Sequence, residues 1–171
     1  SSDSILFFGQ GNLFQKASAP AAGTLLEQYA ANQARLASNT RKMKSAIAAV
    51  KRQVGKTWYV FSGATPRGWD CSGLVMWTYK KLGIELEHSA TAQAHSGKVV
   101  TDPVPGDVVA FSYDGKKWFY HVGLYIGNGR MIHAEAPGTR TRIDSVTRFA
   151  KGSGGVKVRF IRIVDQLLPA A

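Results

Sequence analysis

The chain contains one cysteine, Cys71, in the stretch GWDCSGLVMW. A helix is predicted from Cys71 to Leu82, directly after Asp70, so the sulfur would lie at the positive end of the helix dipole beside unpaired backbone N–H groups. This position favours the thiolate and can lower the pKa of a cysteine. A lone cysteine is commonly a buried apolar side chain. Here, however, the N–H groups could also hold an oxyanion, and the small neighbours Ser72 and Gly73 leave room for a substrate, as an acyl-transfer nucleophile requires.

A thiolate nucleophile also needs an imidazole as its base, and the chain has four histidines. His121 opens a predicted strand, and His133 lies on the next strand, beyond a tight turn at 127–129. The two positions lie about equally far from the turn, so pairing of the hairpin would bring the two rings side by side. One ring could then act as the base while the other fixes its orientation. We expect no catalytic role for His88 and His95, which fall in the loop-like segment EHSATAQAHSG.

A long helical pattern precedes the cysteine. Thr24 and Glu27 form a capping box ahead of an apolar run, Gly55 is the expected stop, and residues 38–40 could divide the segment into two helices. Residues 1–23 are rich in Ser, Gly, Ala and Pro, and we expect them to be irregular. Apolar residues recur along one face of the predicted helix: Leu25, Tyr29, Leu36, Met43, Ile47, Val50 and Val54.

Beyond the Cys71 helix the pattern changes to strands. Four are predicted, and the last alternates apolar and basic residues, so that one face would be buried and the other exposed. Helices that precede a run of strands favour an α+β fold, with the nucleophile helix packed on an antiparallel sheet, over a doubly wound sheet. The predicted strands cover residues 107–112, 121–126, 130–134 and 156–164.

The composition narrows the possible partners and sites. The chain carries 22 Lys and Arg against 11 Asp and Glu, a formal net charge of +11. This charge would attract a polyanion such as nucleic acid, an acidic membrane surface or an anionic cell wall. Because the charge is spread along the chain, nucleic-acid binding is disfavoured. A single cysteine excludes an internal disulfide and a multi-cysteine zinc site, and the short apolar runs exclude a membrane span.

Four ordered motifs, VGKTWYVFSG, GWDCSGLV, PGDVVAF and HVGLYIGNGRMIHA, resemble the NlpC family of cell-wall cysteine peptidases over roughly residues 41–164. The resemblance implies a papain-like α+β fold and hydrolysis of peptide bonds in the stem of peptidoglycan, with no metal and no cofactor. It also implies three catalytic roles: Cys71 as the nucleophile, His121 as the general base and His133 as the polar residue that orients the base.

Three further residues are expected around the nucleophile. By the same resemblance, Tyr59 would lie near the thiolate and the oxyanion, and Asp70 would meet the free amino end of the stem peptide, unless it only caps the following helix. The backbone of Ser72 would help to hold the oxyanion. Where the family usually has Tyr-x-Trp-Gly-Gly, this chain has YVFSG at 59–63, which changes the expected shape of the pocket. A KKWF insert before the predicted base could alter access to the cleft.

The expected reaction is cleavage of the γ-D-glutamyl bond to a diamino acid through a thioester acyl-enzyme. Two alternatives remain open: an amidase that cuts the N-acetylmuramoyl–L-alanine bond, and a catalytically silent domain that binds anionic wall polymer. A nucleic-acid binder is supported by charge alone. The expected domains are a linker or partner-docking segment, 1–40, and a peptidase domain, 41–171. The chain begins without Met, and we expect a segment that acts outside the cytoplasm, from a secreted enzyme or a phage tail.

Overall fold

The computed structural model describes residues 5–6, 14–15 and 22–167. The chain divides into two compact units, Ser1–Arg35 and Leu36–Ala171. The first contains two short antiparallel strands, β1 (Ile5–Leu6) and β2 (Phe14–Gln15), and the start of helix α1 (Ala22–Lys51). The irregular structure predicted for 1–23 is therefore wrong for these strands, and residues 1–4, 7–13 and 16–21 lie outside the described part.

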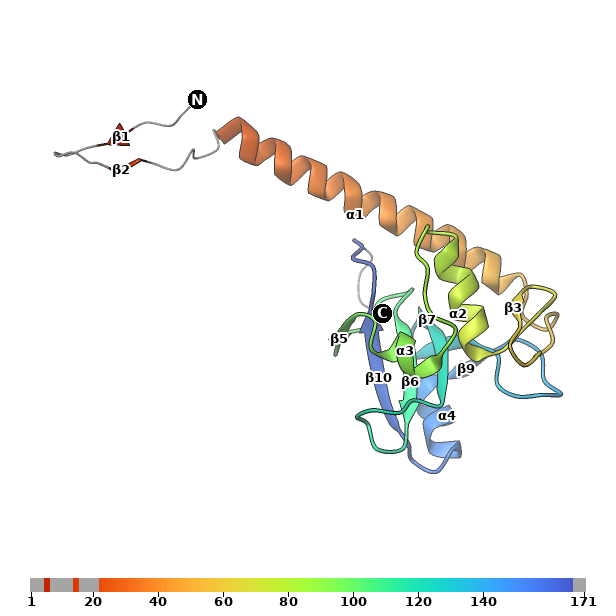
Figure 1. Ribbon diagram of the computed structural model, residues 1–171. Coiled ribbons are helices and arrows are strands. Elements are labelled where there is room, and N and C mark those ends of the chain that lie inside the picture. Colours follow the sequence, from red (N-terminus) through yellow and green to blue (C-terminus); the bar gives the residue numbers. More distant parts are fainter. Residues whose placement is uncertain (1–4, 7–13, 16–21, 168–171) are drawn as a thin grey trace. The chain divides into compact units, whose positions relative to one another are not determined.

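The second unit contains the end of α1 and all later elements (Figure 1). In chain order these are β3 (Ala64–Thr65), β4 (Gly68–Trp69), α2 (Cys71–Lys80), α3 (Ala90–Ala94), β5 (Lys98–Val100), β6 (Val108–Ser112), β7 (His121–Gly127), β8 (Arg130–His133), β9 (Arg142–Ser145), α4 (Val146–Gly152) and β10 (Lys157–Arg162). Within the described ranges, no helix has the length and apolar character needed to cross a membrane.

Helix α1 is continuous and differs from the prediction in two ways. It begins at Ala22, so Thr24 lies inside the helix and does not cap it. The segment 38–40 does not break the helix, because Thr40 donates its hydroxyl to the carbonyl of Leu36 at 2.9 Å and stays hydrogen-bonded within it. The polar residues that suggested a break are therefore accommodated in a single helix.

The main sheet has six strands in the order β5-β10-β6-β7-β8-β9, and every neighbouring pair is antiparallel. All four predicted strands form, as β6, β7, β8 and β10, and the α+β prediction is confirmed. The two edge strands, β5 and β9, and the short helices α3 and α4 were not predicted. Each edge strand has only three or four residues, too few to show a clear alternation in the sequence.

The sheet is covered on both faces. On one face, α2 and the second half of α1 pack against Val108 and Ala110 of β6. On the other face, α4 packs against Val109 and Phe111 of the same strand. Successive residues of a strand point to opposite faces, so β6 is buried on both sides and reads as an unbroken apolar run. This arrangement fixes α2, the helix that carries the cysteine, against the sheet.

Candidate active site

Cys71 is the first residue of α2, and its sulfur lies between the first turn of that helix and the start of β7. Three backbone N–H groups, those of Val122, Ser72 and Cys71 itself, act to lower the pKa of the thiol and so favour its anion. The residue is partly exposed. At Gly73, an added Cβ would overlap the carbonyl oxygen of Gly63, so glycine is what allows this turn to approach the neighbouring loop. Cys71 is therefore a partly exposed residue whose anion is favoured by nearby backbone N–H groups.

His121 and His133 form a buried hydrogen-bonded pair, with Nε2 of His121 2.8 Å from Nδ1 of His133. The β7–β8 hairpin brings the rings together, and Gly123 leaves room for the neighbouring strand: a Cβ there would lie 2.9 Å from Sδ of Met131 and 3.2 Å from the Cβ of His133. Phe149 of α4 packs on both rings, with ring centroids 5.1 Å from His121 and 4.9 Å from His133. Packing and hydrogen bonding together hold the orientation of both imidazoles.

The pair continues to a carboxylate that sequence reasoning missed. Nε2 of His133 lies 2.7 Å from Oδ2 of Asp144. Arg142 donates its Nε–H to the same oxygen at 2.9 Å, and its Nη1 lies 3.4 Å from Oε1 of Glu135. Candidate metal-ligand atoms of His133, Glu135 and Asp144 lie within 4.8 Å of one another. The guanidinium of Arg142, however, contacts both carboxylates and already supplies the positive charge that they need.

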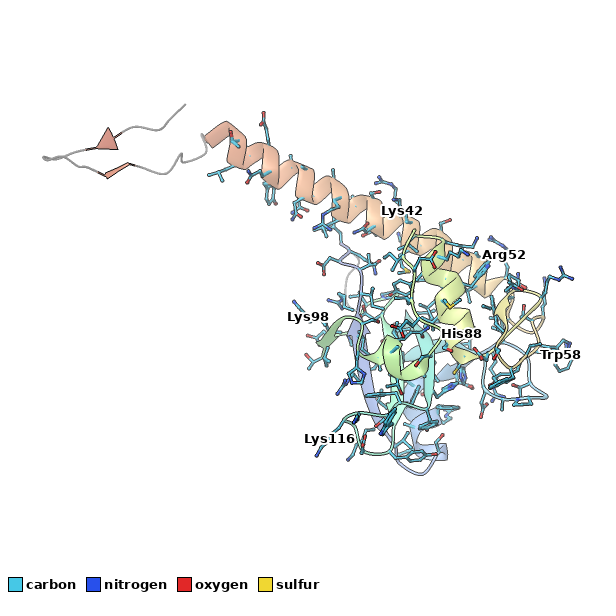
Figure 2. The ribbon with its side chains drawn as sticks, in the orientation of Figure 1. Lys42, Arg52, Trp58, His88, Lys98 and Lys116 are labelled. Carbon is cyan, nitrogen blue, oxygen red and sulfur yellow. The ribbon has the colours of Figure 1, made fainter. Side chains whose placement is uncertain are left out.

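Asp70 is the N-cap of α2, and its carboxylate has four hydrogen-bond partners, three on Oδ1 and one on Oδ2. It accepts hydrogen bonds from the N–H of Gly73 at 2.8 Å, the N–H of Ser62 at 2.9 Å and the hydroxyl of Ser72 at 3.3 Å. Nε2 of His88 is the fourth partner, at 2.8 Å. A carboxylate offers about four lone-pair positions. Within the described part of the chain, Oδ2 accepts only from Ser62, so a substrate amino group could bind there. It could also bind Oδ1 if His88 (Figure 2), whose side chain is partly exposed, moved away.

Tyr59 lies in the loop before β3, where its N–H donates to the carbonyl of Thr139 at 2.9 Å. Burial raises the pKa of Tyr59, and the neighbouring charges of Cys71 and Asp70 raise it further, so its hydroxyl lies within the field of both groups. Ser62, which stands where the family usually has glycine, has a φ of 66°. It thus keeps the left-handed turn that glycine would favour.

Burial controls the protonation of the cysteine and the two histidines. It raises the pKa of the Cys71 thiol, Asp70 raises it further, and the N–H of Val122 only partly opposes this. Burial, followed by the nearby His133, lowers the pKa of His121 to about 3. Burial also lowers the pKa of His133, against the opposing effect of Asp144. The free protein thus favours a neutral thiol and neutral rings, and the thiolate expected from the helix dipole is wrong because desolvation outweighs it.

The structure brings six of the predicted residues to the junction of α2 and β7: Tyr59, Asp70, Cys71, Ser72, His121 and His133. Of the two histidines for which no catalytic role was expected, one contacts Asp70. The other, His95, is exposed and its Nδ1 lies 2.8 Å from the carbonyl of Thr91.

Comparison with known proteins identifies relatives over the part of the chain that contains these residues. Residues 55–153 match the NlpC/P60 family model. The probable endopeptidase Rv2190c of Mycobacterium tuberculosis is 44% identical over 99 residues, which is 57% of this chain and 24% of that protein. The gamma-D-glutamyl-L-lysine dipeptidyl-peptidase of Bacillus subtilis is 37% identical over 92 residues, 52% of this chain and 31% of that protein. The chain thus spans about a quarter to a third of the length of these relatives.

A solved structure supports the fold. The NlpC/p60 domain of the peptidoglycan hydrolase SagA is similar with a TM-score of 0.59 and 26% identity, covering 70% of this chain and 98% of that one. The predicted papain-like α+β fold is confirmed. The six residues at the junction of α2 and β7 all fall inside the matched range, which covers more than half of the chain. The chain therefore belongs to the NlpC/P60 family, a family of cysteine peptidases.

Proposed function

We propose that this domain hydrolyses an amide bond in the stem peptide of peptidoglycan, with Cys71 as the nucleophile. The observation that carries the proposal is the position of the sulfur at the start of α2. There the N–H groups of Val122 and Ser72 favour its anion, beside the strand that begins with His121. Membership of the family, and a relative named as a gamma-D-glutamyl-L-lysine dipeptidyl-peptidase, support the same chemistry.

In the proposed mechanism, His121 accepts the thiol proton as the sulfur of Cys71 attacks the carbonyl carbon. The backbone N–H of Cys71 or Ser72, helped by the hydroxyl of Tyr59, holds the oxyanion that forms. His121, oriented by His133, then gives its proton to the leaving amine. Water hydrolyses the resulting thioester and restores the thiol. Because the resting groups are neutral, the proton moves only when a carbonyl is in place to accept the attack.

The bond proposed for cleavage is that between γ-D-glutamate and the diamino acid. Asp70 lies beside the nucleophile and is a suitable partner for the free amino end of a short stem peptide, at Oδ2 or, if His88 moves away, at Oδ1. The second candidate is an amidase that cuts the N-acetylmuramoyl–L-alanine bond. It is favoured by the four partners that already surround the carboxylate of Asp70, because such a substrate brings no free amino group to this carboxylate.

The basic surface supports action at the cell wall. A net charge of +11 would concentrate the protein at anionic wall polymers. Basic residues occur on separate parts of the second unit, such as Lys42 on α1, Lys98 on β5 and Lys116 in the loop before β7 (Figure 2). This distribution suits general attraction to a polyanion. Both a secreted enzyme and a phage tail component would meet the wall from outside the cytoplasm, with residues 1–40 as a linker or docking segment.

The test is digestion of purified sacculi of known stem-peptide sequence, with Cys71→Ala as the matched control. Mass spectrometry of the released fragments should show new amino termini on the diamino acid, and no release by Cys71→Ala. New L-alanine termini would identify the amidase instead. If the unmodified chain binds sacculi but releases nothing, the domain is a wall-binding module and the proposal is wrong. Activity that persists in Cys71→Ala would show that another group is the nucleophile.

A further inference from the structure

We propose that Asp144 is a positioning residue that determines which nitrogen of His121 accepts the thiol proton. The inference rests on the proposed function, because it assigns a role within the same reaction. It starts from the hydrogen-bonded series described above: Nε2 of His121 to Nδ1 of His133 at 2.8 Å, and Nε2 of His133 to Oδ2 of Asp144 at 2.7 Å. His133 uses both of its ring nitrogens in these two hydrogen bonds, whereas His121 uses only Nε2. The position of the hydrogen in each bond can be derived in turn, starting from the carboxylate of Asp144.

The carboxylate end has only one possible polarity. An ionised carboxylate is an acceptor only, and Arg142 contacts the same oxygen of Asp144 at 2.9 Å, which stabilises the negative charge. Nε2 of His133 must therefore carry the hydrogen of this bond. If the hydrogen were on Nδ1 of His133 instead, two lone pairs would face each other at 2.7 Å beside a ring with no exposed surface.

The polarity of the second bond follows from the first. His133 is neutral, because burial lowers its pKa, and its only proton is on Nε2. Nδ1 of His133 is therefore an acceptor, and the hydrogen of the bond to His121 belongs to Nε2 of His121. A neutral His121 has no further proton. Its Nδ1 is thus the unprotonated nitrogen, and it is the one that can remove the proton from the thiol of Cys71.

Asp144 acts on catalysis through His133 and touches neither substrate nor sulfur. The transfer balances simply: one proton leaves the sulfur, binds Nδ1 of His121 and later passes to the leaving amine. While His121 carries two protons, its Nε2–H still donates to His133. The only charged side chains that join this network are Asp144, Arg142 and Glu135, among the residues that the structure describes.

The experiment compares Asp144→Leu with Asp144→Asn and with the control Asp165→Asn, which removes an exposed carboxylate outside this network. Leucine removes the acceptor and excludes water, and we expect kcat on muropeptides to fall about 10- to 100-fold with KM within twofold. Asparagine retains a carbonyl oxygen for Nε2 of His133 and should recover most of this loss. Asp165→Asn should remain within about twofold of the unmodified chain, since neither ring has a hydrogen bond to Asp165.

A second readout does not depend on activity. Ring ¹⁵N chemical shifts of the unmodified chain should identify His121 as the Nε2–H tautomer, and Asp144→Leu should convert it to a mixture. His121 found as the Nδ1–H tautomer in the unmodified chain would overturn the inference even if no variant folds. So would an Asp144→Leu protein with unchanged kcat and an unchanged tautomer. In either case the role of Cys71 would stand, because its own test is the loss of activity in Cys71→Ala.

Discussion

The buried His121 should make the fold lose stability in acid, and replacing it with glutamine should remove a defined part of that loss. Burial and the nearby His133 lower the pKa of His121 from 6.5 to about 3 in the folded chain. Between these two values the unfolded chain binds a proton at this position and the folded chain does not. Stability therefore falls as the pH falls from about 6.5 towards 3, and the contribution is absent at pH 7 and above.

The size of the effect follows from the same two values. Each proton bound only by the unfolded chain lowers the free energy of unfolding by about 1.4 kcal/mol per pH unit. Between pH 6 and pH 4.5 the unfolded state changes from partly to fully protonated at His121, so this residue alone should account for about 2 kcal/mol of lost stability. His133 acts in the same direction, because burial lowers its pKa as well. The unmodified chain should therefore lose at least this amount.

Urea unfolding followed by tryptophan fluorescence, at pH 7, 6, 5 and 4.5, measures the loss. The comparison uses the unmodified chain, His121→Gln and the control His95→Gln, whose ring is exposed. Carboxylates that titrate in this range contribute to all three proteins alike, so only the difference in slope matters. His121→Gln should lose about 2 kcal/mol less than the other two between pH 6 and 4.5. Three parallel curves, agreeing within about 0.5 kcal/mol, would show that His121 is not held neutral by burial.

Three further outcomes are expected. Alkylation of Cys71 by iodoacetamide, followed by intact mass, should accelerate from pH 7 to 9 because burial raises the thiol pKa; a rate independent of pH between 6 and 8 would contradict this. Gly73→Ala should lower the free energy of unfolding by about 3 kcal/mol, because the added Cβ overlaps backbone atoms. Gly152→Ala, where nothing lies within 4 Å of the added Cβ, should change it by less than about 1 kcal/mol. Urea unfolding of both variants measures the difference. His88→Ala should lower KM roughly fivefold to tenfold for stem peptides with a free amino end, because it frees an acceptor of Asp70, and leave glycan-linked peptides unaffected; equal effects on both would refute the contact with the amino group.

The parts of the site that could be predicted are those with a local signal. The Cys71 helix follows from one capping residue and a short apolar period, and the histidine pair follows from a glycine-rich turn between two strands. In both cases a single helix or a tight turn connects the residues that determine the geometry. Local patterns of this kind set register as well as element type, which is why the two rings could be placed side by side in advance.

Asp144 had no such signal. It lies on β9, a four-residue edge strand that pairs with β8 only after a long loop, with Met131 opposite Asp144. His88 likewise meets Asp70 across a separation of 18 residues, through a loop. The pKa of the thiol was predicted in the wrong direction for a related reason. The helix dipole is visible in sequence, whereas the burial that outweighs it depends on the packing of α2 against β7.

A neutral cysteine and a neutral histidine can still form a thiolate at the moment of attack, because the attraction between the two charges opposes the cost of creating them. Lowering the pKa of His121 to about 3 means that charging this ring alone costs about 5 kcal/mol. Opposite charges about 4 Å apart attract by about 4 kcal/mol at an effective dielectric constant of about 20. The N–H groups of Val122, Ser72 and Cys71 also favour the ionised sulfur. Both effects oppose the burial that keeps Cys71 and His121 neutral at rest, so we expect the ion pair to form together with the attack on a substrate carbonyl.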